Sequence, residues 1–297
     1  MIINPSIFRE YDIRGVAGSE FTDEEIAEYE KWYGPFPGVT LTLEAAEAIG
    51  KAYGTIIVRA GGKRVVVGYE LRPFGEKLYE AFVRGVLSTG CDVLDAGVAL
   101  TPLVYFAVAH FGLDGGVNIT GSHNLYFYNG FKMMKKDVWP LFGEEIQGMR
   151  VLIENEEFIM GEQGVPEKID IYREYEKYVI DHIKIAKPIK VVIDTGNGSA
   201  GMFAPQLFRK LGCEVTELYG ELDAKFPNHT PDPEAPQNMN DLGEEVKKLS
   251  ADFGIGFDAD GDRAGFVDEK GDFVSADLPI LIFAKDVLER QPGKKIL

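Results

Sequence analysis

The feature that most restricts the fold is a regular alternation of helix-like and strand-like segments, which begins at residue 41. Segments with helical spacing of apolar residues alternate with short runs rich in Val, Ile and Leu, which are typical of buried strands. The expected helices are 41–60, 75–90 and 102–111, and the expected strands are 64–68, 92–95 and 115–120. Such alternation predicts a largely parallel sheet with helices on both faces.

The same alternation returns in the second half of the chain. It follows a charged stretch, residues 166–185, that is expected to be helical. The expected segments after it are strands at 190–194 and 214–218, a glycine-rich turn at 195–201 that opens a helix to residue 211, an irregular loop at 226–237 and a helix at 240–249. This is a repeat of pattern and not of aligned sequence.

The predicted fold class is therefore α/β, with two consecutive three-layer α/β/α domains, mixed and largely parallel sheets, and the start of a third domain. The expected domains are 1–160, 161–275 and 276–297, with the first boundary near residues 155–170. In the last of them, 278–290 is expected to be a helix, and Ile296 and Leu297 look like the first residues of a strand. We therefore expect the chain to be the front part of a larger protein.

Length and charge limit the class of function. With 297 residues and 45% hydrophobic side chains, the chain is long enough for about two packed domains. Its 31 basic and 48 acidic side chains give a net charge of −17. This charge argues against nucleic acid and membrane partners, because it repels a nucleic acid or an anionic membrane.

Cysteine usage and hydropathy point to a cytoplasmic protein. Cys91 and Cys213 lie in strand-like contexts in separate halves of the chain and are expected to be buried thiols of a reducing compartment. The N-terminus carries charges where a signal peptide has an apolar region. No apolar stretch approaches the ~20 residues that span a bilayer.

Three aspartates at alternate positions form the strongest candidate site. Asp258, Asp260 and Asp262 lie between two short apolar segments that are expected to be strands. Two like charges ~4 Å apart repel by roughly 4 kcal/mol at an effective dielectric of about 20, so three carboxylates on one turn favour a divalent cation. A few oxygen ligands suit Mg²⁺ held together with a phosphate. The alternative is a solvated turn, in which aspartate and glycine are common.

An EF-hand calcium loop is a further alternative for these aspartates. Their spacing, with Glu269 at position twelve, imitates such a loop. However, Arg263 occupies position six, where the sharp turn of an EF-hand requires glycine, and the flanks resemble strands instead of helices. The pattern therefore favours Mg²⁺ over an EF-hand.

A second group of polar residues follows the expected strand 115–120. Ser122 and His123 come first, and Lys132 follows in what is expected to be the same loop. A serine hydroxyl can carry a phosphoryl group, and a lysine can neutralise phosphoryl oxygens or exchange a proton. The alternative is a turn bent by small polar residues, with His123 as an ordinary hydrogen-bonding side chain.

The order and spacing of the motifs resemble those of the α-D-phosphohexomutases. The motifs are FREYDIRG at residues 8–15, ITGSHN at 119–124, YNGFK at 128–132 and GFDADGDR at 256–263. The chain is most similar to the phosphomannomutase/phosphoglucomutase branch, over essentially its whole length. The resemblance includes DTGNG at 194–198 and FPNH at 226–229.

The resemblance implies a four-domain, Mg²⁺-dependent enzyme that interconverts hexose 1-phosphate and hexose 6-phosphate, of mannose or glucose, through a phosphoserine and a hexose 1,6-bisphosphate. It implies a phosphoserine at Ser122 and Mg²⁺ ligands at Ser122, Asp258, Asp260 and Asp262. Lys132 matches a lysine proposed for acid/base work, and His123 lies beside the serine. Arg14 and Arg263 match arginines near the phosphoryl group. The sugar-recognition and C-terminal phosphate-binding loops of the family would follow residue 297.

Three departures from the family pattern surround the serine. Gly121 stands where relatives usually have alanine, Leu125 where they have proline, and Tyr69 and Glu70 where they commonly have Arg-Asp, just before Arg72. The first two are expected to loosen the loop. None of them removes a group that does chemistry.

Several alternatives for the whole function remain open. The chain alone is expected to turn over phosphosugar slowly or not at all, unless a separate chain or a homo-oligomer supplies the rest. One alternative is a catalytically silent module that binds Mg²⁺ or phosphate, or half of a split assembly. Another is phosphoglucosamine mutase, whose relatives read Asp-Asn-Gly-Ile-Lys at the positions of 128–132.

Overall fold

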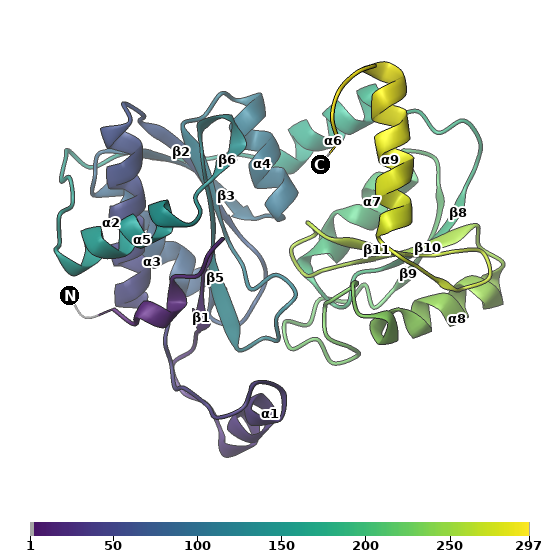
Figure 1. The fold of residues 1–297 in the computed structure, drawn as a ribbon, viewed down its shortest axis with the longest axis horizontal. Coiled ribbons are helices and arrows are strands. Elements are labelled where there is room, and N and C mark those ends of the chain that lie inside the picture. The colour runs from purple at the N-terminus through teal and green to yellow at the C-terminus, as the bar shows by residue number, and fades with distance from the viewer. Residues whose placement is uncertain (1–2, 297) are drawn as a thin grey trace.

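The chain forms two α/β units that lie side by side, each built around its own sheet (Figure 1). The computed structural model describes residues 3–296. The colour runs from purple to teal along the first unit and from teal through green to yellow along the second. Helices cover both faces of mixed sheets in each unit, which confirms the predicted α/β class.

The first sheet has seven strands, and parallel strands form its centre. The strands are β1 (Ile13–Val16), β2 (Arg64–Tyr69), β3 (Asp92–Val98), β4 (Gly115–Ile119), β5 (Tyr128–Lys135), β6 (Trp139–Pro140) and β7 (Pro166–Lys168). Their order is β1-β5-β4-β2-β3-β7, with β6 paired to β5. Strands β4, β2, β3 and β7 are parallel, whereas β5 is antiparallel to β4 and β1.

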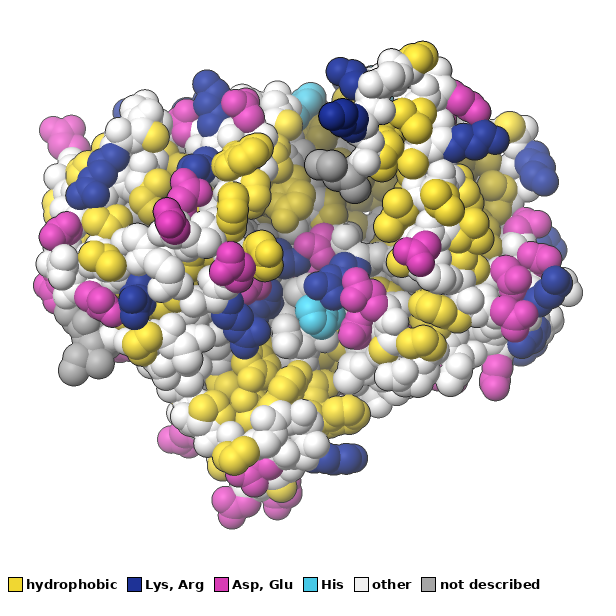
Figure 2. All heavy atoms as spheres, viewed as in Figure 1, with side chains coloured by type: hydrophobic (Ala, Val, Ile, Leu, Met, Phe, Trp, Pro, Cys, Tyr) yellow, Lys and Arg dark blue, Asp and Glu magenta, His cyan; other side chains and the backbone are white. Residues whose placement is uncertain are grey.

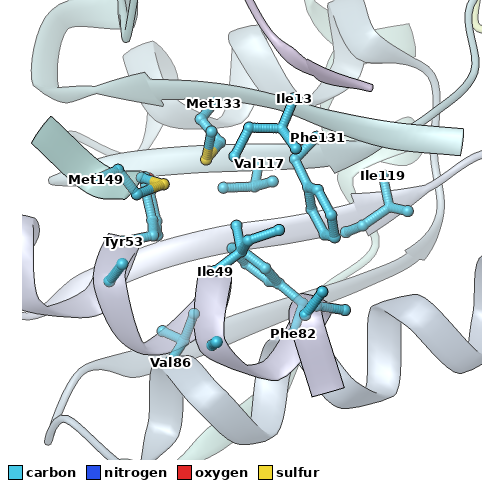
Figure 3. Packing of buried hydrophobic residues seen from close by; sticks show 14 of the residues in the cluster. Ile13, Ile49, Tyr53, Phe82, Val86, Val117, Ile119, Phe131, Met133 and Met149 are labelled. Carbon is cyan, nitrogen blue, oxygen red and sulfur yellow. The ribbon is translucent and has the colours of Figure 1, made fainter. Parts of the chain in front are cut away.

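Helices cover both faces of this sheet. The helices of the first unit are α1 (Asp23–Tyr33), α2 (Leu43–Arg59), α3 (Gly75–Leu87), α4 (Thr101–His110) and α5 (Glu144–Glu154). α2, α3 and α5 form a core with one face of the sheet, and α4 packs on the other. In Figure 3, Phe82 of α3 lies against Phe131 of β5, and the two rings stack with centroids 5.1 Å apart. Gly50 and Gly85 allow α2 and α3 to approach closely, because a Cβ on either would overlap the backbone of the other helix.

The second sheet carries the acidic turn on a hairpin. Its strands are β8 (Lys190–Asp194), β9 (Glu214–Leu218), β10 (Phe253–Phe257), β11 (Ala264–Val267) and β12 (Phe273–Val274), in the order β12-β11-β10-β8-β9. Strands β10, β8 and β9 are parallel, and β11 is antiparallel to β10. The helices of this unit are α6 (Ile171–His182), α7 (Ala204–Lys210), α8 (Asn240–Leu249) and α9 (Asp277–Arg290).

The helices of the second unit are placed on both faces of its sheet. α8 packs on one face and α7 on the other. α6 packs against α4 and so joins the two units at the top of Figure 1. Short 3₁₀ helices complete the structure, at Pro5–Ile7, Lys136–Val138, Ser199–Met202 and Pro236–Met239. In the described part of the chain, no helix has the length and apolar character needed to cross a membrane.

Most of the predicted elements form, but the stretch at 166–185 was predicted wrongly at its start. Pro166–Lys168 is strand β7, which runs along the exposed edge of β3 in the first sheet. Only then does α6 begin, where the Asp170 side chain accepts a hydrogen bond from the Arg173 N–H. An edge strand keeps one side in water, so its charged residues do not distinguish it from an exposed helix. The first sheet therefore extends beyond residue 160, which is the predicted end of the first domain. The limits of the domains stay a prediction.

Three other predictions need correction or fall short. The segment that carries Lys132 is strand β5 and not a loop, and helix α1 was not predicted. Cys91 is a buried free thiol, but Cys213 is only half-buried. Ile296 lies in no strand, and Leu297 lies outside the described residues.

Candidate functional site

The three aspartates lie on the turn between β10 and β11. These strands are antiparallel, with Phe257 opposite Ala264, so the flanks are strands as predicted and not the helices of an EF-hand. The Asp258 carboxylate accepts a hydrogen bond from the Arg263 N–H at 3.0 Å, which closes the turn. One carboxylate oxygen from each of Asp258, Asp260 and Asp262 lies within 4.8 Å of the others.

Burial makes this concentration of negative charge energetically unfavourable. Asp258 and Asp260 are fully buried, whereas Asp262 reaches solvent. Burial first, and then the neighbouring carboxylates, raise the pKa of Asp258 well above its usual value. Burial also acts to raise the pKa of Asp260, but the charge of Lys132 and the hydrogen bonds to this carboxylate together outweigh it and lower that pKa. The turn therefore needs positive charge beside it.

Lys132 supplies one such charge from the first unit. It lies on β5 opposite Asn118 of β4, so the sheet register sets its position. Its Nζ is 2.8 Å from Asp260 Oδ2 and also contacts Asp262 Oδ2. Burial alone would lower the pKa of Lys132, but these two carboxylates outweigh it and raise the pKa.

Ser122 faces the same carboxylates from the loop after β4. Its hydroxyl donates to Asp258 Oδ2 at 2.9 Å, and the Lys132 Nζ lies 3.2 Å from its Oγ. The Ser122 backbone has a φ of 53°, in the left-handed region that non-glycine residues seldom adopt. The structure thus brings the predicted serine, lysine and aspartates together across the boundary between the two units.

A buried arginine organises the loop around Ser122. The Arg72 guanidinium donates to the carbonyl oxygens of Ser122 at 2.7 Å and of Leu125 at 2.8 Å, and it forms an ion pair with the buried Glu70. Glu70 in turn accepts the Gly121 N–H at 2.8 Å. Sequence reasoning noted Glu70 and Gly121 as departures from a family pattern and Arg72 as a match to it, so their role in shaping the loop was missed.

Two threonines of the first unit hold Asp260 of the second. The hydroxyls of Thr101 and Thr120 donate to Asp260 Oδ2 at 2.5 and 3.1 Å, and the Asn118 amide donates to the Thr101 hydroxyl at 2.8 Å. Thr101 was also missed. A signal was present, because Thr101 and Thr120 follow β3 and β4, the parallel strands on either side of β2, and the carboxyl ends of parallel strands meet at one edge of a sheet.

The remaining predicted residues lie around the same hollow. His123 Nδ1 is 3.4 Å from Ser122 Oγ, and burial, followed by the charge of Arg263, lowers the pKa of His123. Arg14 is buried, donates to the Thr120 carbonyl at 2.8 Å and pairs with Asp12. Arg263 is half-buried and lies 3.2 Å from Glu234.

These side chains line one pocket of about 490 Å³ between the units. In Figure 2, basic and histidine side chains gather in the hollow at the centre of the view, with acidic side chains beside them. The members named above that line the pocket are Arg14, Ser122, His123, Lys132, Asp262 and Arg263. A cationic wall of this kind attracts an anionic ligand despite the net charge of the chain.

The residues fit a small divalent cation. Three carboxylates of suitable spacing provide oxygen ligands, and the Ser122 oxygen lies beside them. Asp260 Oδ1 is buried and has no hydrogen-bond partner among the described residues, although Oδ2 of the same group accepts three hydrogen bonds. A buried carboxylate oxygen without a donor is costly, and a cation would satisfy it.

This chain therefore belongs to a class of proteins in which two α/β units share one site. In that site, a serine loop of one unit meets an acidic loop of the other. Residues 5–160 match the α/β/α domain I of phosphoglucomutase/phosphomannomutase, and residues 173–271 match domain II. The chain therefore belongs to the phosphoglucomutase/phosphomannomutase family.

Individual relatives agree with this assignment. The chain is 42% identical, over 98% of its length, to a phosphomannomutase/phosphoglucomutase of Pseudomonas aeruginosa. It is 39% identical, over 99% of its length, to a phosphoglucomutase of Neisseria gonorrhoeae. A crystal structure of a family protein from Burkholderia thailandensis superposes with a TM-score of 0.87 at 38% identity, over 98% of this chain and 61% of that one. The chain spans 58% of the length of the Pseudomonas protein and 60% of the Neisseria protein.

Proposed function

We propose that this chain carries the phosphoserine and metal-binding part of a hexose phosphomutase acting on glucose or mannose phosphates. The observation that carries the proposal is the 2.9 Å contact between Ser122 Oγ and Asp258 Oδ2, which joins the two loops in one site. The names of the relatives, which include both phosphomannomutase and phosphoglucomutase, support the class of substrate. The chain spans 58% of the length of the Pseudomonas relative. The interconversion of hexose phosphates by a whole enzyme is therefore also a proposal.

Asp258, Asp260 and Asp262, together with an oxygen on Ser122, would hold the proposed Mg²⁺. When bound, Mg²⁺ neutralises the charge that develops on a phosphoryl group in transfer. Asp260 would offer Oδ1, because Thr101, Thr120 and Lys132 already occupy Oδ2. The three donors hold the carboxylate in one orientation, so the ligand is in place before the cation arrives.

Ser122 would accept a phosphoryl group from a hexose 1,6-bisphosphate. The Ser122 O–P bond forms as the P–O bond to the sugar breaks, and the proton of the Ser122 hydroxyl must leave. Asp258 Oδ2 already accepts the hydrogen bond from this hydroxyl. His123 Nδ1 lies 3.4 Å away, and its lowered pKa keeps the ring neutral and able to accept a proton.

Lys132, Arg14 and Arg263 would stabilise the phosphoryl oxygens. The raised pKa of Lys132 keeps it an ammonium group, which suits charge stabilisation and proton donation to a sugar oxygen better than proton removal. Arg263 is half-buried at the pocket wall, where its guanidinium can reach an anion. A phosphosugar bound here would therefore meet cations from both units.

The test is phosphoryl transfer to the serine itself. The purified chain is incubated with Mg²⁺ and glucose 1,6-bisphosphate, and its intact mass and peptide masses are measured. We expect one added phosphate on Ser122, none in Ser122→Ala, and normal uptake in Ser275→Ala, whose serine is exposed and distant in sequence. An unmodified Ser122 after this treatment would instead favour a silent Mg²⁺- or phosphate-binding module.

A further inference from the structure

Helix α1 lies outside the layers of both sheets and beneath the serine loop (Figure 1). Four aromatic residues of this segment, Phe21, Tyr29, Tyr33 and Phe36, pack against one another and are called the aromatic brace below. Tyr29 lies at the centre, with ring centroids 5.1 Å from Tyr33 and 5.2 Å from Phe36. Tyr29 is buried although it belongs to a short helix at the edge of the molecule.

The aromatic brace packs directly on the loop that follows Ser122. The centroid of the Phe127 ring lies 5.5 Å from that of Tyr29 and 5.9 Å from that of Phe21. The ring centroids of Tyr128 and Tyr33 are 5.0 Å apart. Leu125, Tyr126 and Phe127 are all buried in this cluster. Figure 2 shows hydrophobic side chains in the lower centre of the view, above α1. The loop that carries Ser122 is thus covered by apolar contacts.

One peptide group of the loop is held from two sides. The Leu125 N–H donates to the Tyr33 hydroxyl at 3.2 Å, and the Asn124 carbonyl of the same peptide group accepts from Arg72 at 2.8 Å. Proline at this position would lack the N–H group. Ser122, three residues earlier, has the left-handed φ of 53°, and such backbone persists only where surrounding contacts hold it.

Helix α1 and the serine loop also contact the second unit. Lys225 Nζ lies 3.1 Å from Glu25 Oε1, which belongs to the first turn of α1, and 5.4 Å from the centre of the Tyr126 ring. Phe226 is buried in the same cluster as Tyr29 and Phe127. The segment therefore contacts the serine loop and the unit that carries the aspartates.

We propose that the aromatic brace positions the loop that carries Ser122, and that Tyr33 is a positioning residue for phosphoryl transfer to that serine. The inference rests on the proposed function, because the hydroxyl that is positioned is the phosphoryl acceptor. Tyr33 contacts neither the aspartates nor Lys132. It acts through the Leu125 peptide and the packing of Tyr128.

The test removes the Tyr33 hydroxyl and leaves its ring. Tyr33→Phe is compared with Trp32→Phe, which alters an exposed neighbour on the same helix that is not part of the cluster. Hydrogen exchange of the peptide that spans residues 121–128 is followed by mass spectrometry. Loss of one hydrogen bond is expected to speed exchange at Leu125 by about fivefold in Tyr33→Phe, with no change in Trp32→Phe. Equal unfolding midpoints confirm that both variants fold.

The second measurement is the rate at which Ser122 takes up phosphate from glucose 1,6-bisphosphate. In Tyr33→Phe the maximal rate is expected to fall by about fivefold, while the half-saturating bisphosphate concentration stays the same, because the loop and not the ligand site is disturbed. A purely structural role would leave this rate unchanged in a folded variant.

The outcomes distinguish the proposed function of the chain from the proposed role of Tyr33. Exchange at Leu125 equal to that of the wild-type chain overturns the inference, and so does faster exchange with an unchanged transfer rate. If the wild-type chain takes up no phosphate, the proposed function fails, and the role of Tyr33 in phosphoryl transfer fails with it. If the wild-type chain takes up phosphate and only Tyr33→Phe slows, both proposals are supported.

Discussion

At the scale of single residues, the serine loop is shaped by the buried pair of Arg72 and Glu70. The guanidinium of Arg72 satisfies several loop carbonyls at once, and Glu70 accepts the Gly121 N–H. The pKa of Glu70 is raised, first by burial, which Arg72 only partly offsets. A planar donor group with five N–H bonds suits this task, and a lysine would not replace it.

Gly121 is expected to tolerate no side chain. A Cβ there would overlap the guanidinium of Arg72, so Gly121→Ala must displace the group that organises the loop. We expect a loss of about 1–3 kcal/mol in the free energy of unfolding, measured with urea. Gly148→Ala is the control, because this exposed helical glycine has open space for a Cβ and should gain about 0.5–1 kcal/mol. Equal effects at both positions would contradict the steric argument.

Asp260 is expected to be essential for the response to Mg²⁺. Magnesium at about 100 times its dissociation constant should raise the free energy of unfolding of the wild-type chain by about 2.7 kcal/mol. Asp260→Asn removes a charged ligand and should abolish most of this gain, whereas Asp272→Asn, at an exposed aspartate of the next turn, should keep it. Thermal unfolding and calorimetric titration with Mg²⁺ measure the effect. A full response in Asp260→Asn would exclude this site.

At the scale of elements, the end of β8 and the loop that contains His229 are joined by a second charged pair. His229 Nε2 lies 3.0 Å from Asp194 Oδ2, and its Nδ1 lies 2.8 Å from the Thr230 carbonyl. Burial acts to lower the pKa of His229, but the hydrogen bond and charge of Asp194 outweigh it and raise the pKa. The pair therefore holds this loop to β8 most firmly when the ring is protonated.

The stability of the chain is expected to depend on pH through His229. A pKa raised in the folded state contributes stability that is complete below the unfolded pKa of about 6.5 and is lost as the pH rises through the folded pKa. The wild-type chain should therefore lose more stability than His229→Gln when the pH rises from about 6 to about 8.5. At the lower pH, His229→Gln should cost about 1.5–3 kcal/mol.

Urea unfolding at the two pH values measures this difference. His182→Gln is the matched control, because His182 is exposed and its ring bonds only locally, to the Tyr178 carbonyl. An identical pH dependence in the wild-type chain and His229→Gln would exclude His229 as the group responsible.

At the scale of the whole molecule, the site is also the joint between the two units. The Thr101 N–H donates to the Asp260 carbonyl at 3.0 Å, its hydroxyl donates to the Asp260 carboxylate, and the Leu71 N–H donates to Ser199 Oγ at 2.8 Å. A polar group that is buried in such a joint lowers the stability of the fold when it loses its partner. The geometry of the site and the docking of the units therefore depend on each other.

Thr101→Val is expected to weaken this joint. Valine keeps the shape of threonine, but Asn118 loses an acceptor and Asp260 loses a donor, so the free energy of unfolding should fall by about 1–3 kcal/mol. Thr216→Val, at an exposed position of β9, should change it by less than about 0.5 kcal/mol. Urea unfolding followed by circular dichroism measures both. A neutral Thr101→Val would mean that the joint does not need this hydroxyl.

From the amino-acid sequence alone we could predict the α/β class, most helices and strands, the acidic hairpin, and the list of residues expected at the site. These follow from local periodicity and residue chemistry, which short stretches of chain carry on their own. They also include Ser122 and Lys132, although the strand on which Lys132 lies was not foreseen.

How these groups meet could not be predicted in this way, because it depends on the fold of the whole chain. The roles of Thr101, Arg72 and Tyr33 depend on contacts between residues far apart in the chain, and no local pattern contains such contacts. Strand β7 was missed for the same reason, since its pairing with β3 and not its own composition makes it a strand. A sequence gives the residue type at each position, whereas the packing of whole sheets and helices sets the distances between those residues.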